Sequence, residues 1–409
     1  MCLEILFLLS RVMVGTKFVL FLFISYSFAI KGIYFVSPET GSSTNDGSRS
    51  SPFFSVADAL NAPPGSNGVL VIELLEGTYT GPDNIGLVFN NPTEIRHTED
   101  SKAIFDCNGG QQTVFTATSD FSVTSFKYNT IYFQNCAEGI RINGTASNQK
   151  TFTLQHLTFK DATSAIYSTD VAYLHIIRAK FQNSMLTAIG IDSYDSALVL
   201  RACSFTGVAF DVEKYGHLIM ELVTVEDVHT EKSPMNIQAE DIEISFLGVK
   251  NCSSSSSGGA MTLTGPGEVA MLAGQFDSCT TAGNGGAITM SQMTSTFENV
   301  RFFDCKASGN GGAVYDDSIG AEFLYYHVRF DSCSATYGGA LDIEGRYFDN
   351  NFNNVVFTNN FASVNGSCAA CCVNSPNNCQ VGPIDTVDVY YMDNSGPGSL
   401  FTCEFEQNI

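Results

Sequence analysis

Short runs in which apolar and polar residues alternate cover most of the chain. Examples are AYLHIIRAKF (172–181), SALVLRACSF (196–205) and AEFLYYHVRF (321–330). Alternation with a period of two is typical of β-strands that bury one face, and turn residues separate the runs. One short helix is predicted, at Phe54–Leu60. The pattern therefore predicts an all-β protein.

The second half of the chain repeats every 26 to 28 residues. Each unit has a Phe-x-x-Cys motif, a small polar turn and a Gly-Gly-Ala triplet, and weaker copies extend from Phe133 to Phe405. The repeated positions are Gly258, Gly259, Gly285, Gly286, Gly311, Gly312, Gly338 and Gly339 in the glycine pairs, Phe276, Phe302, Phe330 and Phe357, and Cys252, Cys279, Cys305 and Cys333.

A repeat of this length with one or two strands per unit predicts a parallel β-solenoid. Successive coils then stack at roughly 4.8 Å, so that the phenylalanines form an inward aromatic column. Glycine is expected at the corners because a tight bend needs positive φ and neighbouring coils leave no room for a Cβ. A phosphate-binding loop is rejected, since no helix follows GNGGA (309–313). Equivalent cysteines of stacked coils are expected to have Cα atoms within disulfide range. Their parallel Cβ directions do not suit the geometry of a disulfide, so a ladder of buried thiols is favoured.

The N-terminus predicts a secretory signal peptide over residues 1–29. Lys17 precedes an apolar run, Phe18–Ile24, and small residues surround Ala29. Translation from Met13 would suffice for this signal, and an uncleaved anchor is the alternative interpretation. We divide the rest into an N-terminal cap with the first coils (30–100) and the β-helix repeats (101–409). The chain stops in the middle of a unit, which indicates a truncated C-terminus or an oligomerising end.

The net charge and the cysteines of the chain argue against some classes of function. The formal net charge of −22 argues against nucleic-acid binding, and weak binding of Ca²⁺ or cationic partners is the functional alternative to simple solubility. We predict no cofactor. The Cys-rich loop 366–380 predicts disulfides rather than zinc, because it contains no histidine. Its cysteines are Cys368, Cys371, Cys372 and Cys379, and the predicted N-glycosylation sites are Asn143, Asn251 and Asn365.

The repeat resembles that of the chlamydial polymorphic outer-membrane proteins. The shared hallmarks are Gly-Gly-Ala followed by an apolar residue, and Phe-x-x-Asn, which is intact at Phe357/Asn360 with Cys in place of Asn at the earlier copies. YFVSPETGSSTNDGSRSSPFFSVADAL (34–60) is similar to the opening of many right-handed parallel β-helix proteins. The resemblance implies a surface-exposed or secreted adhesin. The membrane β-barrel of the bacterial members is missing, and the signal and sequons indicate a protist member.

A polysaccharide-active β-helix enzyme of the pectate lyase or galacturonidase type is the rival hypothesis. It requires either a Ca²⁺ site of several carboxylates beside an Arg or Lys base, or clustered aspartates acting as acid and base. The candidate residues are Asp316, Asp317, Asp342 and Glu344, with Arg301 or Arg329 as bases, and stacking is expected to bring Asp316 near Asp342. The full signature of the polygalacturonases is not found.

From the sequence we therefore expect a secreted or cell-surface, adhesin-like binding protein without catalytic activity. Its expected partners are glycans or proteins on host or neighbouring cells. The carbohydrate-active enzyme is the alternative, and a purely structural coat protein is a third class.

Overall fold

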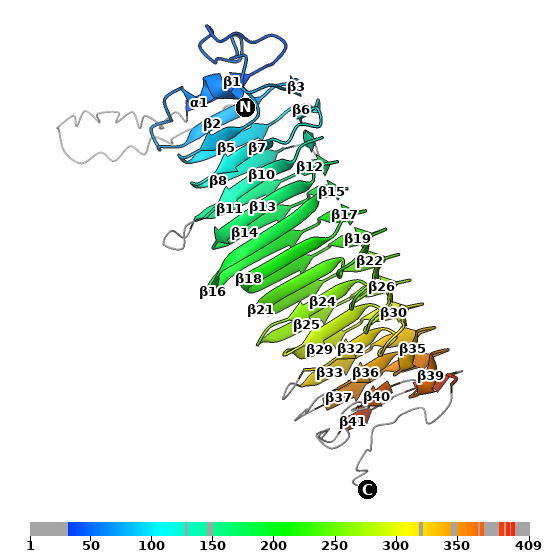
Figure 1. Cartoon of the computed structure of the whole chain (residues 1–409). Helices are drawn as coiled ribbons and strands as arrows, with labels where there is room; N and C mark the ends of the chain where they lie inside the picture. The colour runs from blue at the N-terminus through cyan, green and yellow to red at the C-terminus, as the bar shows by residue number, and fades with distance from the viewer. Residues whose placement is uncertain are drawn as a thin grey trace, which may run out of the picture.

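The computed structural model shows a right-handed parallel β-solenoid, as the sequence predicts. The structure describes residues 32–126, 130–144, 150–318, 322–344, 350–366, 369–371, 384–387, 390–392 and 394–396. Strands stack into an elongated rod with the first strand, β1, at one end and β39 and β41 near the other (Figure 1). Every strand pairing between coils is parallel, and three sheets of 23, 13 and six strands run along the rod.

The 23-stranded sheet consists of two rows of strands. The first row contains β4 (Leu87–Phe89), β7 (Thr113–Ala117), β10 (Glu138–Asn143), β13 (Ser164–Val171), β24 (Met261–Thr264), β28 (Ile288–Ser291), β32 (Val314–Asp316), β36 (Leu341–Ile343) and β40 (Ala369–Cys371). The second contains β1 (Gly32–Val36), β2 (Leu70–Leu74), β5 (Thr93–His97), β8 (Phe121–Ser125), β11 (Thr151–Gln155), β14 (Tyr173–Ile177), β25 (Glu268–Leu272), β29 (Thr294–Glu298), β33 (Phe323–Tyr326), β37 (Asn350–Asn353) and β41 (Ile384–Val387). Three long strands, β16 (Met185–Arg201), β18 (Phe210–Glu221) and β21 (Met235–Ser245), run through both rows and join them into one sheet.

The other two sheets close each coil. The 13-stranded sheet contains β3 (Gly77–Tyr79), β6 (Ala103–Asp106), β9 (Ile131–Gln134), β12 (Leu157–Lys160), β15 (Lys180–Gln182), β17 (Ser204–Thr206), β19 (Thr224–Glu226), β22 (Gly248–Lys250), β26 (Gln275–Asp277), β30 (Arg301–Phe303), β34 (Arg329–Asp331), β38 (Val356–Thr358) and β42 (Tyr390–Met392). The six-stranded sheet contains β20 (His229–Thr230), β23 (Ser253–Ser254), β27 (Thr280–Thr281), β31 (Lys306–Ala307), β35 (Ser334–Tyr337) and β39 (Phe361–Asn365).

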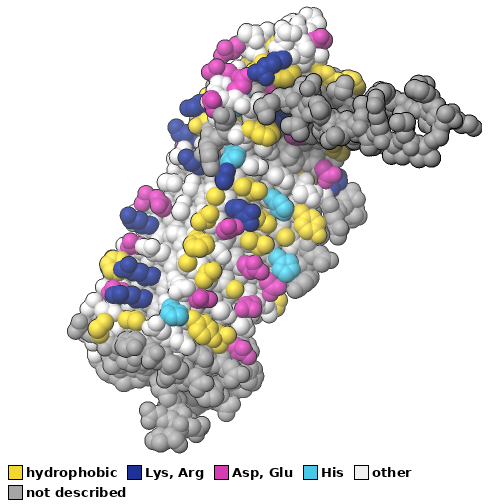
Figure 2. Space-filling view, turned by 180° about the vertical axis from the view of Figure 1, so that it is seen from behind, with side chains coloured by type: hydrophobic (Ala, Val, Ile, Leu, Met, Phe, Trp, Pro, Cys, Tyr) yellow, Lys and Arg dark blue, Asp and Glu magenta, His cyan; other side chains and the backbone are white. Residues whose placement is uncertain are grey.

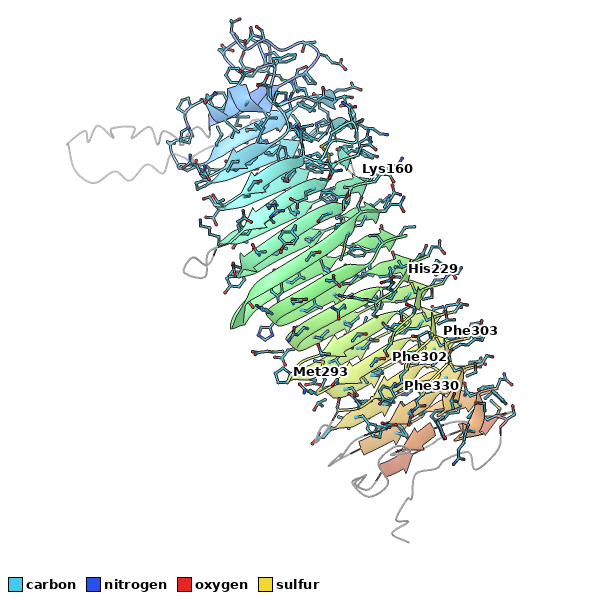
Figure 3. The ribbon with its side chains drawn as sticks, viewed as in Figure 1. Lys160, His229, Met293, Phe302, Phe303 and Phe330 are labelled. Atoms are coloured by element: carbon cyan, nitrogen blue, oxygen red, sulfur yellow. A yellow bond between two sulfur atoms is a disulfide. The ribbon has the colours of Figure 1, made fainter. Side chains whose placement is uncertain are left out.

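The core is a column of side chains that stack from coil to coil. Phe276, Phe302, Phe330 and Phe357 are fully buried, and successive ring centroids lie 5.0 to 5.1 Å apart. The labelled rings of Phe302 and Phe330 belong to this column (Figure 3). A second stack of phenylalanines runs from Phe105 to Phe205, and Val225 and Val249 occupy the equivalent positions between the two stacks. Each coil therefore gains most of its burial from its neighbours.

The corner after the 13-stranded sheet needs a left-handed backbone in almost every coil. Asn135, Asp161, Asn183, Asp227 and Asn251 there have φ between 50° and 57°. Asn and Asp adopt this conformation more readily than other residues with a Cβ. Their side chains also bond between coils, as where Asn251 Nδ2 donates to Asp227 Oδ1 at 2.7 Å. The residue before the Cys or Asn of each Phe-x-x-Cys/Asn motif therefore makes the turn.

The glycine pairs serve two different needs. Gly258, Gly285, Gly311 and Gly338 have φ between 55° and 68°, where residues with a Cβ are strained. The second glycine of the pair lies against the next coil, because a Cβ on Gly286 would sit 1.9 Å from the carbonyl oxygen of Gly312. The four alanines that follow the pairs are completely buried.

A short helix, α1 (Val56–Leu60), lies at the N-terminal end of the rod and packs on β1 and β2 (Figure 1). Ser55 caps it through a reciprocal pair of hydrogen bonds with Asp58. The helix begins two residues later than the sequence predicts, because Ser55 takes the extended conformation of an N-cap.

The cysteines divide into one disulfide and five free thiols among the described residues. Cys107 and Cys136 form a disulfide between consecutive coils, which the sequence analysis missed. Asp106 pairs with Gln134, so the two cysteines are offset by one position and are not directly above one another. Parallel Cβ directions therefore do not prevent this bond. Cys203, Cys252, Cys279, Cys305 and Cys333 are buried free thiols.

We predict that Gly286→Ala lowers the free energy of unfolding by about 1–3 kcal/mol or more, because the added methyl collides with the backbone of the next coil. Gly248→Ala is the matched control, since the nearest atom to its Cβ is Thr224 Cγ2 at 3.7 Å and the substitution is expected to be neutral or to stabilise by about 0.4–1 kcal/mol. Urea unfolding followed by circular dichroism measures both. Equal destabilisation by the two variants would contradict close stacking at the second glycine.

Candidate functional site

The structure places Asp316 and Asp342 on opposite faces of the sheet. Asp316 pairs with Ile343, and its side chain is buried in the interior, where Oδ1 accepts a hydrogen bond from the backbone N–H of Ser318. Asp342 pairs with Tyr315, which faces outward. The expectation that stacking brings Asp316 near Asp342 is therefore wrong, because the two residues differ by one position in the strand alternation.

A different set of residues meets at this point on the outer face. We call Asn310, Tyr315, Asp342 and Glu344 the Asp342 cluster. The Tyr315 hydroxyl donates to Glu344 Oε2 at 3.1 Å, and Asn310 Nδ2 lies 3.3 Å from Glu344 Oε1. Glu344 directly follows β36, two residues after Asp342, so in the extended chain the two side chains leave the same face with Cα atoms roughly 6.6 Å apart. Two carboxyl groups and two hydrogen-bond donors thus share one site.

Asp342 is the most perturbed carboxyl of the cluster. It is fully buried, and neither carboxyl oxygen has a hydrogen-bond partner. Burial and then the charge of Glu344 raise the pKa of Asp342 to about 8. The backbone N–H of Ile343 and the amide of Asn310 act in the opposite direction, although neither makes a hydrogen bond of standard geometry to the carboxyl. Asp342 therefore holds its proton at neutral pH.

Tyr315 and Asp317 complete the surroundings of the pair. Burial, and then the charges of Glu344 and Asp317, raise the pKa of Tyr315. Its phenol therefore stays protonated and remains a donor to Glu344. Asp317 follows β32 and is exposed to solvent.

The basic residues named from the sequence lie on another sheet. Arg301 and Arg329 pair with each other in the 13-stranded sheet. Arg301 lies over the ring of Phe303 at 5.2 Å, and Arg329 bonds to Asp331 at 3.0 Å. They are not brought to the Asp342 cluster, because the candidate carboxyls belong to the 23-stranded sheet.

An equivalent acid pair was missed in the sequence. Phe210–Asp211–Val212–Glu213 in β18 matches Leu341–Asp342–Ile343–Glu344 at the same positions of its coil. Burial raises the pKa of Asp211. Lys232 and Asn236 lower this pKa, and the charge of Glu213 raises it further. The repeated pattern apolar-Asp-aliphatic-Glu was the signal that could have revealed both pairs.

The remaining predicted sites lie apart from this cluster. Asn251 is exposed at a corner, whereas Asn143 and Asn365 are partly buried at strand ends, and glycosylation of all three stays a prediction. The signal segment 1–29 and the side chains of Cys368, Cys371, Cys372 and Cys379 fall outside the described residues. Within the described residues, no three His, Cys, Asp or Glu side chains are placed to hold a metal ion. No helix in that same part of the chain is long and apolar enough to cross a membrane.

Comparison with known proteins found similar solved structures but no protein that is similar in sequence. No protein-family model and no curated protein matches the chain, so the resemblance to polymorphic outer-membrane proteins stays a prediction. The chain is similar to the GH136 lacto-N-biosidase from Eubacterium ramulus, with 10% identity and a TM-score of 0.44 over 88% of this chain and 68% of that chain. It is also similar to a rhamnogalacturonan lyase, with 11% identity and a TM-score of 0.36 over 87% of both chains. At such identities no residue of this chain takes a role from these proteins.

We predict that Asp342→Asn stabilises the protein increasingly as pH rises from about 4 to about 8. The folded pKa of Asp342 lies above its ordinary value of 3.8, so the wild type loses stability as the unfolded carboxyl ionises while the folded one stays protonated. The loss is up to about 1.4 kcal/mol per pH unit and ends once the folded carboxyl also ionises. Urea unfolding at several pH values measures the difference. A difference between wild type and variant that is independent of pH would contradict the raised pKa.

Proposed function

We propose that the protein cleaves glycosidic bonds of a polysaccharide, with Asp342 as general acid and Glu344 as the second carboxyl of the pair. The observation that carries the proposal is the buried, protonated carboxyl of Asp342 beside a second carboxyl on the same face. Glycosidases commonly use such a pair, in which surroundings keep one carboxyl protonated and leave the other ionised.

The cluster supplies each part of that chemistry. Asp342 donates its proton to the glycosidic oxygen as the bond to the leaving sugar breaks. Glu344, oriented by Tyr315 and Asn310, stabilises the positive charge that develops on the sugar or takes a proton from the attacking water. Asp342 is completely buried in the structure, so its carboxyl has to become accessible to a bound sugar before the proton can pass.

The acidic surroundings favour hydrolysis over elimination from a uronide. A lyase abstracts a proton next to a carboxylate and builds up negative charge, which Asp317 and Glu344 would repel. The positive charge that develops during glycoside hydrolysis is attracted by the same groups.

Adhesion is the second candidate function, and an exposed apolar patch favours it. Leu222, Phe246 and Leu272 lie at the ends of three consecutive strands of the second row and are 52%, 55% and 39% exposed. Leu222 and Phe246 also have positive φ, which is strained for bulky side chains. Hydrophobic side chains gather among acidic, basic and histidine side chains on one face of the rod (Figure 2). A patch of this kind is typical of a protein-binding surface.

We predict that Asp342→Asn and Glu344→Gln each lower kcat on a neutral polysaccharide by about 10²–10⁴-fold, because each removes one half of the acid–base pair. Activity of the wild type is expected to fall as pH rises through about 8, where Asp342 loses its proton. The release of reducing ends measures both effects.

Glu243→Gln is the matched control, because this exposed glutamate lies in the second row, away from the cluster. The variant is expected to keep full activity. If the wild type releases no reducing ends from glucans, mannans or xylans, the enzymatic proposal fails, and the adhesion proposal is tested next by substitution of Phe246.

A further inference from the structure

The two acid pairs mark the ends of a continuous row of polar side chains. Six neighbouring strands, β18, β21, β24, β28, β32 and β36, hydrogen-bond in this order along the rod (Figure 1). We call the polar track the outward side chains of these strands, together with Asp317 and Glu344, which directly follow β32 and β36. Its members are Asp211, Glu213, Asn236, Gln238, Thr262, Thr264, Thr289, Ser291, Tyr315, Asp317, Asp342 and Glu344.

We propose that the polar track binds a linear, electrically neutral polysaccharide along the rod axis, with about one sugar per coil, and delivers it to Asp342. This inference rests on the proposed function. It adds the class of substrate and the orientation of the bound chain along the rod. The five strand intervals span roughly 24 Å, and the strand spacing of roughly 4.8 Å is close to the rise of one sugar in an extended chain.

The middle of the track is built from hydroxyl and amide groups. The hydroxyls of Thr262 and Thr289 donate to carbonyl oxygens of their own coils, at 3.5 Å from Ser257 O and 3.0 Å from Asn284 O. Their lone pairs therefore remain free to accept hydrogen bonds from sugar hydroxyls. Asn236 and Gln238 add both donors and acceptors to the same face.

The fully buried carboxyl of Asp342 points to a ligand independently of this row. Its two oxygens have no hydrogen-bond partner, and leaving a buried polar group unsatisfied costs about 1–3 kcal/mol. A glycosidic oxygen and a neighbouring sugar hydroxyl would satisfy both. The carboxyl lies at the end of the track, where a bound chain would reach the acid pair.

The charge of the track selects a neutral chain. Its members include five acids and no Lys or Arg. Among the described residues, Lys232 is the cation whose charge acts on Asp211, at the end of the track away from Asp342. A polyuronate would place a carboxylate on nearly every sugar above these acids and would be repelled. Pectate and galacturonan are therefore excluded as substrates by this inference, whereas they were the alternative that the sequence suggested.

Calorimetry on the full chain carrying Asp342→Asn tests the track without turnover. The probes are the hexasaccharides and disaccharides of β-1,4-glucan, β-1,4-mannan, β-1,4-xylan and β-1,3-glucan, with polygalacturonate as the charged comparison. At least one neutral hexasaccharide is expected to bind tenfold or more tightly than its disaccharide. Thr262→Val combined with Thr289→Val is expected to weaken that hexasaccharide tenfold or more, and Ser at both positions is expected to restore binding.

Thr296→Val is the matched control, because Thr296 faces outward in β29 of the second row and donates to Glu268. It is expected to leave affinity unchanged, and thermal unfolding of each variant checks that the fold is intact. Tighter binding of polygalacturonate than of every neutral hexasaccharide would overturn the proposal that the track binds a neutral chain. Equal affinity for each hexasaccharide and its disaccharide would overturn it as well. The proposed function fails separately, if Asp342→Asn leaves the turnover of neutral polysaccharides unchanged.

Discussion

Backbone hydrogen bonding between coils held in vertical register is the interaction on which the structure depends. Each coil presents its N–H and C=O groups to the next, so a side chain at one position of the repeat lies directly above its equivalent. The Phe column, the left-handed corners and the close approach of Gly286 to Gly312 follow from this register. The same register lines up polar residues of distant sequence position on the outer face.

The sequence was sufficient to predict the features that recur in every coil. The phase of Gly-Gly-Ala and of the phenylalanines predicted coil length and solenoid architecture, because these residues meet the same steric demand in every coil. It was insufficient where a single coil departs from the pattern. The disulfide between Cys107 and Cys136 depends on a one-residue offset at a corner, which the periodicity does not contain.

The candidate site shows where the reasoning from sequence stopped short. Asp316 and Asp342 follow successive glycine pairs at nearly equal distances, yet one position decides whether a carboxyl enters the core or leaves the sheet. Alignment of Val-Tyr-Asp (314–316) with Leu-Asp-Ile (341–343) would have shown this. The burial of Asp342 and the hydrogen bonds of Glu344 with Tyr315 and Asn310 could not have been predicted, because they depend on how neighbouring coils pack.

Stability and the proposed chemistry are linked at Asp342. A carboxyl kept protonated by burial costs folding free energy at neutral pH, and proteins retain such groups most often where chemistry uses them. Carbon-13 NMR of the Asp342 carboxyl, assigned with Asp342→Asn, measures its titration directly. The account predicts a midpoint near pH 8 that falls when Glu344 is replaced by Gln. A midpoint near the ordinary value of 3.8 would contradict it.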